Sequence, residues 1–356
     1  MRYMVRINIL CRQKKANITG GNIYDSYLFE QVEKEDNIEV RYITDEQIGC
    51  KILLFYSIYC WMSRKDILDC DKLIINSSRF SKFLPFLFFL RFQKKRLPVI
   101  TIHHHFGFRQ LQGIKKYVYR WMELQFLKYC DIIITPNQYV REELLSHFGS
   151  SKIAFLELAF NKVPNKKITP QFGNFLYVGT IEKRKGIKYL IESLALLSAE
   201  MKKEITVNIV GKVVEQAYYK SILKLINRLG LQKNVKFHGR LSDEELSTAY
   251  QNASYFVFPS LHEGYGMVII EAMSYGIPVI AFDNSAMPYT IKNGYNGLLI
   301  KNKNIHELAD RMQTVFIDKN LREKLSIGAL ETYNRARSLN DLDKDISLFI
   351  KQTLLC

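Results

Sequence analysis

The most informative part of the chain reads Pro259-Ser-Leu-His-Glu-Gly-Tyr-Gly-Met-Val-Ile-Ile-Glu-Ala-Met-Ser-Tyr-Gly-Ile-Pro-Val-Ile-Ala281. An apolar run ends at Pro259, and helix-forming residues follow from Met267 to Tyr275. Gly276 is placed to end that helix in a left-handed conformation, and Pro278 prevents its continuation. This part of the chain therefore predicts a strand, a glycine loop, a short buried helix and a second strand, as in an α/β fold.

The loop Glu263-Gly-Tyr-Gly266 comes just before the predicted helix. A helix N-terminus favours an anion, and glycines let a phosphate approach the backbone closely. Glu263 and Glu271 bracket this loop, and ionised carboxylates only accept hydrogen bonds, which suits the hydroxyl groups of a sugar or a ribose. The alternative is a strand–turn–helix unit without any phosphate, in an ordinary doubly wound domain.

The same residues resemble the E-x7-E signature of family 4 of the retaining, nucleotide-sugar-dependent glycosyltransferases, whose fold is called GT-B. Two glutamates at this spacing mean little alone, but the surrounding Pro-Ser, Glu-Gly-Tyr-Gly, Glu-Ala-Met and Gly-Ile-Pro-Val make the match specific. The resemblance implies that Glu263 binds the donor sugar as a catalytic-site residue and that Glu271 binds the ribose. It also implies contacts to the donor diphosphate from Gly264, Tyr265, Gly266 and Met267.

Length and composition indicate a globular protein of two domains. The chain has 356 residues, with 47% hydrophobic and 24% charged residues. Its formal net charge of +16 favours an anionic partner, such as nucleic acid, an acidic membrane surface or a phosphorylated substrate. No recognised nucleic-acid motif accompanies the charge, so we expect no specific nucleic-acid partner.

The cysteines and the N-terminus indicate a cytoplasmic protein. The six cysteines are scattered without a C-x2-C pair, which is typical of reduced thiols and predicts no zinc site. Residues 1–10 lack the apolar core of a signal peptide, and no apolar run approaches the roughly 18 residues of a membrane helix. We therefore expect a soluble or peripheral membrane protein.

The first half of the chain is expected to form a Rossmann-like domain over residues 1–165, on the acceptor side. A strand at Tyr3–Leu10 leads into a polar loop that ends at Gly20 and Gly21, and a helix follows to about Val32. A glycine pair at this place is expected to contact a ligand phosphate or an acceptor. Members of the resembling family often have such a pair facing the cleft between the domains, but an ordinary turn explains it equally well.

Residues 72–122 contain eleven Lys or Arg and no Asp or Glu. Within them lies the apolar run Phe83–Leu90, which is too short to span a bilayer. Basic residues beside Phe and Leu are typical of an interfacial segment attracted to anionic lipid headgroups. The alternative is a buried helix whose polar ends are basic. The complete absence of acids favours the first reading, so we expect these residues to bind the inner face of the plasma membrane.

A strand predicted over Pro98–His103 ends in three adjacent histidines, His103-His104-His105. Adjacent side chains on a strand point in opposite directions, so these histidines do not form a metal chelate. In the resembling family a strand ends in Thr-x-His near the donor sugar. By position the resemblance implies a catalytic-site role for His103, with His104 as the alternative.

The second half is expected to form a nucleotide-sugar-binding Rossmann-like domain over residues 172–335. A strand at Phe175–Val178 leads into Gly179 and then into the cations Lys183-Arg-Lys185. Such a turn, at the carboxyl end of a first strand, suits a diphosphate, whereas the alternative is a solvated run of charges.

The resemblance places the diphosphate-binding lysine at Lys185. Many members have arginine where this chain has Thr180, so Arg184 is expected to supply the second charge. Gly179 and Gly211 are expected in the two loops that face the cleft. The D-x-D pairs at Asp69–Asp71 and Asp341–Asp343 are expected at the surface, and no metal ion is required.

Together these features predict an α/β protein of the GT-B type. It would have two facing Rossmann-like domains with parallel sheets, and a terminal helix over residues 336–356 that packs back on the N-terminal domain. The resemblance implies a retaining transferase that moves a hexose from a nucleoside diphosphate sugar, with a UDP-sugar expected, to a lipid-linked glycan in bacterial surface polysaccharide assembly. No further cofactor is expected. The alternatives are a non-catalytic membrane- or polymer-binding scaffold of the same fold and a nucleotide-sugar epimerase.

Overall fold

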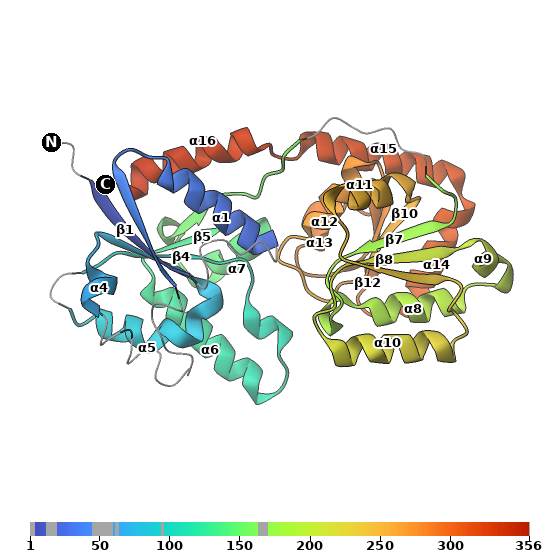
Figure 1. Ribbon diagram of the computed structural model, residues 1–356, viewed down its shortest axis with the longest axis horizontal. Helices are drawn as coiled ribbons and strands as arrows, with labels where there is room; N and C mark the ends of the chain where they lie inside the picture. The colour runs from blue at the N-terminus through green and yellow to red at the C-terminus, as the bar shows by residue number, and fades with distance from the viewer. Residues whose placement is uncertain are drawn as a thin grey trace. The chain divides into compact units, whose positions relative to one another are not determined.

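The computed structural model describes residues 4–11, 20–44, 60, 64–93, 96–162 and 170–355. The chain divides into two compact units, each with its own parallel sheet (Figure 1). Unit 1 consists of Met1–Lys162 and Arg337–Cys356, and unit 2 consists of Val163–Ala336.

Unit 1 contains a six-stranded sheet with the order β2-β1-β3-β4-β5-β6, in which the neighbouring strands pair in parallel. Helices α1 and α16 lie on one side of it, and α5 and α6 lie on the other (Figure 1). Its strands are β1 (Val5–Cys11), β2 (Ile38–Thr44), β3 (Lys72–Asn76), β4 (Val99–Ile102), β5 (Ile132–Thr135) and β6 (Ile153–Phe155). Its α-helices are α1 (Gly20–Glu33), α4 (Arg64–Leu68), α5 (Phe80–Leu90), α6 (Ile114–Tyr129), α7 (Gln138–His147) and α16 (Leu339–Phe349).

Unit 2 contains a second six-stranded parallel sheet with the order β12-β11-β10-β7-β8-β9. Helices α12 and α15 cover one face, and α8 and α10 cover the other (Figure 1). Its strands are β7 (Asn174–Val178), β8 (Thr206–Val210), β9 (Val235–Gly239), β10 (Tyr255–Phe258), β11 (Val279–Asp283) and β12 (Gly297–Lys301). Its α-helices are α8 (Ile187–Leu196), α9 (Ala199–Glu204), α10 (Gln216–Arg228), α11 (Asp243–Asn252), α12 (Met267–Ser274), α13 (Met287–Thr290), α14 (Ile305–Ile317) and α15 (Lys319–Arg335).

The terminal helix belongs to unit 1, as the sequence predicts. The backbone of Phe160 pairs with Ser338 where the chain returns to this unit. In α16, Asp343 accepts a hydrogen bond from the Tyr27 hydroxyl of α1 at 2.6 Å. The α/β fold with two parallel sheets and a returning terminal helix is therefore confirmed.

Two local predictions in unit 1 need correction. Gly20 and Gly21 form the first turn of α1 rather than the end of a loop. The third strand of the sheet is Lys72–Asn76, inside the basic segment, where no strand was predicted. The apolar segment Lys51–Met62 lies outside the described residues except for the buried Cys60.

The apolar run Phe83–Leu90 lies within α5, and half of it forms part of the core. Phe83 and Phe86 are fully buried, whereas Phe88 and Phe89 are about half exposed at 44% and 50%. The inner side of α5 is therefore a buried helix face, as the alternative to membrane binding predicts. Only its outer side is accessible to a membrane.

Candidate functional site

The residues predicted to bind the donor surround the topological switch point of unit 2. From β7 the chain adds β8 and then β9 on one side, whereas β10 pairs with β7 on the other side. In doubly wound sheets ligands bind outside the carboxyl ends of the strands at such a point. Lys185 follows β7 and Glu263 follows β10, so both lie at this crevice.

Gly179 and Gly211 lie side by side at the ends of the neighbouring strands β7 and β8. A Cβ atom on Gly211 would lie 1.9 Å from the carbonyl oxygen of Gly179, so the two loops approach as closely as backbone allows. The predicted loop position of both glycines agrees with this geometry. The structure gives them a packing role, and their contact with a ligand stays a prediction.

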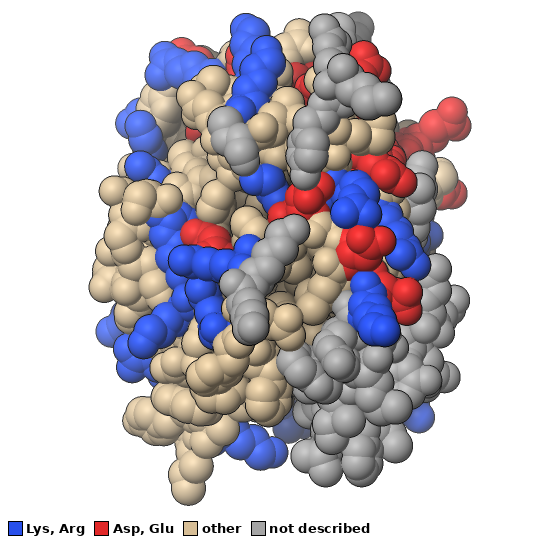
Figure 2. All heavy atoms as spheres, turned by 90° about the vertical axis from the view of Figure 1, so that its left-hand side faces the viewer, with Lys and Arg blue, Asp and Glu red and all other residues tan. Residues whose placement is uncertain are grey.

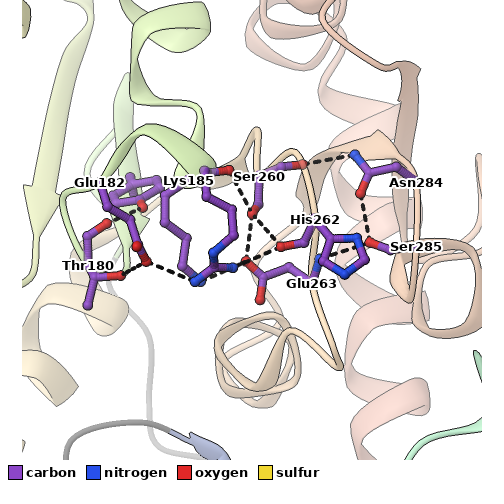
Figure 3. Close-up of polar contacts among 10 residues, drawn as sticks. Thr180, Glu182, Lys185, Ser260, His262, Glu263, Asn284 and Ser285 are labelled. Carbon is purple, nitrogen blue, oxygen red and sulfur yellow. Dashed lines mark hydrogen bonds and ion pairs between the residues drawn. The ribbon is translucent and has the colours of Figure 1, made fainter. Parts of the chain in front are cut away.

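Glu263 lies at the centre of a buried ion cluster (Figure 3). Its Oε1 accepts from Lys185 Nζ at 2.7 Å and from Arg184 Nη1 at 3.1 Å. The Ser260 hydroxyl donates to the same oxygen at 2.6 Å. Glu182 accepts from Arg184 Nη2 at 2.8 Å, so two carboxylates balance the two cations of the cluster, Arg184 and Lys185.

Burial by itself would raise the pKa of the Glu263 carboxyl. The charges of Lys185 and Arg184, with hydrogen bonds from Lys185 and Ser260, outweigh burial and lower that pKa. Glu263 is thus ionised near neutral pH. Its Oε2 makes no hydrogen bond with any residue that the structure describes, so one acceptor oxygen remains for a ligand hydroxyl.

The loop Gly264–Gly266 leads directly into α12. Gly266 adopts a left-handed conformation and is the N-cap residue, and Met267 is the first helical residue. Helix geometry leaves the first N–H groups of α12 without intrahelical partners. Together with the dipole, these groups make the helix start a suitable place for a phosphate. Tyr265 lies in this loop and is partly exposed.

Glu271 lies one turn further along α12. Its Oε2 accepts a hydrogen bond from the Tyr250 hydroxyl at 3.0 Å. Tyr250 in turn stacks on Tyr275, with ring centroids 5.2 Å apart, so its position is fixed from both sides. Burial raises the pKa of Glu271, the Tyr250 hydrogen bond lowers it, and the charge of Asp243 raises it further, for a net rise. The predicted ribose-binding carboxylate is therefore held in place by a partner that the sequence analysis missed.

The remaining predicted residues, Gly20, Gly21 and His103, lie in unit 1. His103 has no exposed surface, its Nδ1 lies 2.9 Å from the Ser77 hydroxyl, and its ring packs edge-on against Phe106. Burial and the charges of its histidine neighbours hold the pKa of His103 well below its usual value. The His103 ring is thus enclosed by residues of unit 1, and its predicted contact with the donor sugar stays a prediction.

The alternative histidine, His104, does have an accessible edge. Its Nε2 lies 2.7 Å from Asp25 Oδ1, and its side chain is 19% exposed. Asp25 is a buried carboxylate on α1 that sequence reasoning did not single out. The signal in the sequence that could have pointed to it is a single acid, Asp25, one helical turn after the pair Gly20 and Gly21.

Metal binding was not predicted for this chain. Among the described residues, no group of three or more His, Cys, Asp or Glu is arranged to hold a metal ion.

Two family models match adjacent parts of the chain. Residues 55–157 match the model "Glycosyltransferase Family 4", and residues 161–332 match the model "Glycosyl transferases group 1". The chain belongs to glycosyltransferase family 4. The predicted family and fold are thereby confirmed, and the matched boundary near residue 160 agrees with the division into two units.

Individual relatives of this family 4 protein are distant. An uncharacterized 41.2 kDa protein in the cps region of Klebsiella pneumoniae is 27% identical over 62% of this chain and 62% of its own length. The O-antigen chain mannosyltransferase B of Escherichia coli is 27% identical over 57% of each chain. The matched region thus spans less than two thirds of either relative.

Solved structures share the fold over the full chain. HepE from Anabaena, crystallised with UDP and glucose, superposes with a TM-score of 0.75 and 16% identity, covering 98% of this chain and 99% of that protein. Identity at this level shows that the GT-B fold is shared.

Proposed function

We propose that this family 4 protein is a retaining glycosyltransferase. It would move a hexose from a nucleoside diphosphate sugar, a UDP-sugar, to a lipid-linked glycan during assembly of a surface polysaccharide. The observation that carries this proposal is the ion cluster at the switch point of unit 2, where Glu263 holds Lys185 and Arg184 beside the start of α12.

The cluster contains the groups that such a reaction needs. When the bond between C1 of the sugar and the diphosphate breaks, negative charge grows on the leaving diphosphate. Lys185, Arg184 and the N–H groups at the start of α12 stabilise that charge without reorganising, since the cluster already holds them in place. Glu263 Oε2 accepts a hydroxyl of the donor sugar, and Glu271 accepts the ribose hydroxyls. Retention with attack from the face of the leaving group follows from family analogy.

The names of relatives support the proposed product and donor. The Escherichia coli relative is described as an O-antigen chain mannosyltransferase, and the Klebsiella relative is encoded in a cps region. HepE, of the same fold, was crystallised with UDP and glucose. These proteins favour a surface glycan as product and a UDP-sugar as donor for this chain.

The experiment that tests the donor is a thermal-shift panel with UDP, GDP, ADP and CMP on the wild type and on Glu271→Ala. A nucleotide at about 100 times its dissociation constant stabilises by roughly 2.7 kcal/mol, or about 5–11 °C for a domain of this size. We expect UDP alone to shift the wild type and the shift to be lost in Glu271→Ala. A wild type that no nucleotide stabilises would contradict the proposal and favour the non-catalytic scaffold.

A lipid-linked acceptor would require contact with the cytoplasmic face of a membrane, and we propose that α6 makes that contact. Ile114, Tyr117, Val118 and Trp121 are 81%, 70%, 49% and 61% exposed, and their spacing puts them on one side of the helix. We call these four residues, together with the basic residues Lys115, Lys116 and Arg120 between them, the α6 patch.

Three of the eleven basic residues in residues 72–122 pair with acids from outside that segment. Arg91 and Arg96 pair with Asp131, and Arg109 pairs with Glu143 at 2.7 Å. Lys115, Lys116 and Arg120, by contrast, have no acidic partner in the part of the chain that the structure describes. An apolar stripe beside such cations is typical of a helix that lies in an anionic membrane interface.

In Figure 2, Lys and Arg are spread over the left half of the view with fewer Asp and Glu among them, whereas acidic and basic groups lie side by side on the right half. Within the described residues, none of the helices combines the length and apolar character that crossing a bilayer requires.

The membrane contact is tested by co-sedimentation with vesicles of phosphatidylcholine alone or with phosphatidylglycerol. We expect the wild type to bind only the anionic vesicles, with a blue shift of Trp121 emission. We expect the double variant Tyr117→Ser/Trp121→Ser to lose co-sedimentation with these vesicles. Ile327→Ser on α15 removes an equally exposed apolar side chain and is the matched control. Equal sedimentation of both variants would contradict a role for the α6 patch.

A further inference from the structure

Unit 1 has a polar cluster at its own topological switch point. The strand order of its sheet is β2-β1-β3-β4-β5-β6. From β1 the chain adds β2 on one side and β3 on the other, so the switch point lies between β1 and β3. Asp25 comes from α1, which follows β1, and Asn76 ends β3. His104 follows β4, the next strand along. The cluster thus occupies in unit 1 the place that the ion cluster of Glu263 occupies in unit 2, where doubly wound sheets bind ligands.

The carboxylate of Asp25 is buried and held on both oxygens. Oδ1 lies 2.7 Å from His104 Nε2, and Oδ2 accepts the side-chain amide of Asn76. The Asn76 carbonyl oxygen is in turn fixed by the backbone N–H of Ser78 at 2.9 Å. Because the Asp25 carboxylate only accepts, the Nε2–H group of His104 donates this hydrogen bond. In this tautomer of the neutral ring, Nδ1 is a hydrogen-bond acceptor.

The His104 ring packs against α1, and its backbone is fixed by Asn137, the N-cap residue of α7. A Cβ atom on Gly21 would lie 3.3 Å from Cδ2 of the ring, so the glycine lets α1 lie directly against it. Tyr24 packs edge-on at 5.7 Å, and Asn137 donates to the backbone carbonyl of His104 at 3.0 Å. Nδ1 makes no hydrogen bond with any residue that the structure describes, although the ring is partly exposed.

We propose that His104 Nδ1 binds the attacking hydroxyl group of the acceptor, with Asp25 as the residue that sets its tautomer. The inference rests on the proposed transferase function and adds the residues that receive the acceptor, which neither the family match nor the relatives assign. An imidazole held in the tautomer with the proton on Nε2 presents one acceptor lone pair at Nδ1, which suits a sugar hydroxyl or, in its absence, water. Holding the attacking oxygen in place accounts for a large part of the rate of such a reaction.

The test uses release of nucleoside diphosphate from UDP-glucose, UDP-galactose, UDP-N-acetylglucosamine or GDP-mannose, with water or octyl glycosides as acceptors. The variants are His104→Gln and Asp25→Asn. In Asp25→Asn, the Asn76 amide still needs an acceptor oxygen, so the introduced amide points its N–H at Nε2. The proton then moves to Nδ1, which becomes a donor while the shape of the site is kept. His105→Gln changes the exposed neighbouring histidine and is the matched control.

We expect His104→Gln and Asp25→Asn to lower kcat by about tenfold or more, with unchanged KM for the donor, unchanged nucleotide affinity and unchanged unfolding temperature. His105→Gln should retain the wild-type kcat. Wild-type rates in both site variants would overturn the inference and leave the proposed function standing. A wild type that binds nucleotide but releases no diphosphate to any of these acceptors also overturns it. A wild type that binds no nucleotide removes the proposed function, and this inference with it.

Discussion

Replacing Glu263 with glutamine removes the charge that holds Lys185 and Arg184 together. The side chains of Glu263, Lys185 and Arg184 are 9%, 12% and 27% exposed. Removing one partner of a buried ion pair costs about 3–5 kcal/mol, because the other charge is left buried. In the variant, Arg184 still pairs with Glu182 and is partly solvated. We therefore expect Glu263→Gln to lower the free energy of unfolding by about 3 kcal/mol, the lower end of this range.

Differential scanning calorimetry of the ligand-free protein measures this loss. About 3 kcal/mol corresponds to a fall of roughly 6–12 °C in the unfolding temperature of a unit of this size. Glu323→Gln breaks the exposed pair with Lys319 at 3.7 Å and is the control, for which we expect a change within about 0.5 kcal/mol. A shift in Glu263→Gln no larger than in the control would refute the idea that the cluster stabilises unit 2.

The same variant carries a pH signature. The pKa of Glu263 is lowered in the folded protein from its ordinary value of 4.5. The ionised form therefore contributes stability above pH 4.5, and this contribution is lost as the pH falls through the lower, folded pKa. We expect the wild type to lose more stability than Glu263→Gln between pH 4.5 and pH 3. Parallel acid profiles would contradict the lowered pKa.

Three further predictions concern single side chains. Burial raises the pKa of Glu123 to about 7, so wild-type stability should fall as the pH rises from 4.5 to 7, and urea unfolding of Glu123→Gln should lack this slope. A Cβ on Gly186 would lie 1.9 Å from a backbone carbonyl oxygen, whereas Gly230 shares its positive φ but faces open space. Gly186→Ala should thus cost well over the roughly 1–2 kcal/mol of Gly230→Ala, and equal urea midpoints would contradict this packing. Tyr250→Phe removes the 3.0 Å hydrogen bond to Glu271 and should weaken nucleotide binding by about 3–10-fold in titration calorimetry, whereas an unchanged affinity would show that the bond does not position Glu271.

Local signals in the sequence predict the region around α12 well. A helix was predicted over Met267–Tyr275, and the structure has it over Met267–Ser274, with Gly276 at a φ of 65° after its end. Proline and glycine act through the backbone of their own residues, so such boundaries can be read without tertiary structure. A local signal of the same kind marks α11, whose first turn carries Asp243, Glu244 and Glu245 and whose N-cap Ser242 forms a capping box with Glu245.

Long-range partners could not be predicted in this way. Lys185 and Glu263 are 78 residues apart, and only the pairing of β7 with β10 brings them together. Sequence reasoning therefore assigned the cations to the diphosphate and the glutamate to the sugar, and missed that they form one cluster. In the same way, a count of charges within residues 72–122 could not show that Asp131 and Glu143 neutralise several of the arginines.

Burial accounts for the other differences. Lys72–Asn76 is a short apolar run without flanking glycine or proline, so nothing in the sequence distinguishes strand β3 from a helix segment. His103 and His104 are identical in type and adjacent in sequence, yet one is enclosed by Ser77 and Phe106 and the other has an accessible edge. Only their surroundings decide which ring can meet a ligand.

Glycosyl transfer from a nucleotide sugar is the central claim, and turnover of the donor measures it most directly. Nucleoside diphosphate release would be followed for each nucleotide sugar, with anionic vesicles that carry lipid extract as the source of acceptor. The account predicts release from a UDP-sugar by the wild type and by Lys183→Ala, whose side chain is exposed, and a loss of at least about a hundredfold in Lys185→Ala. Equal rates in Lys185→Ala and Lys183→Ala, or no release by the wild type from any nucleotide sugar, would contradict it.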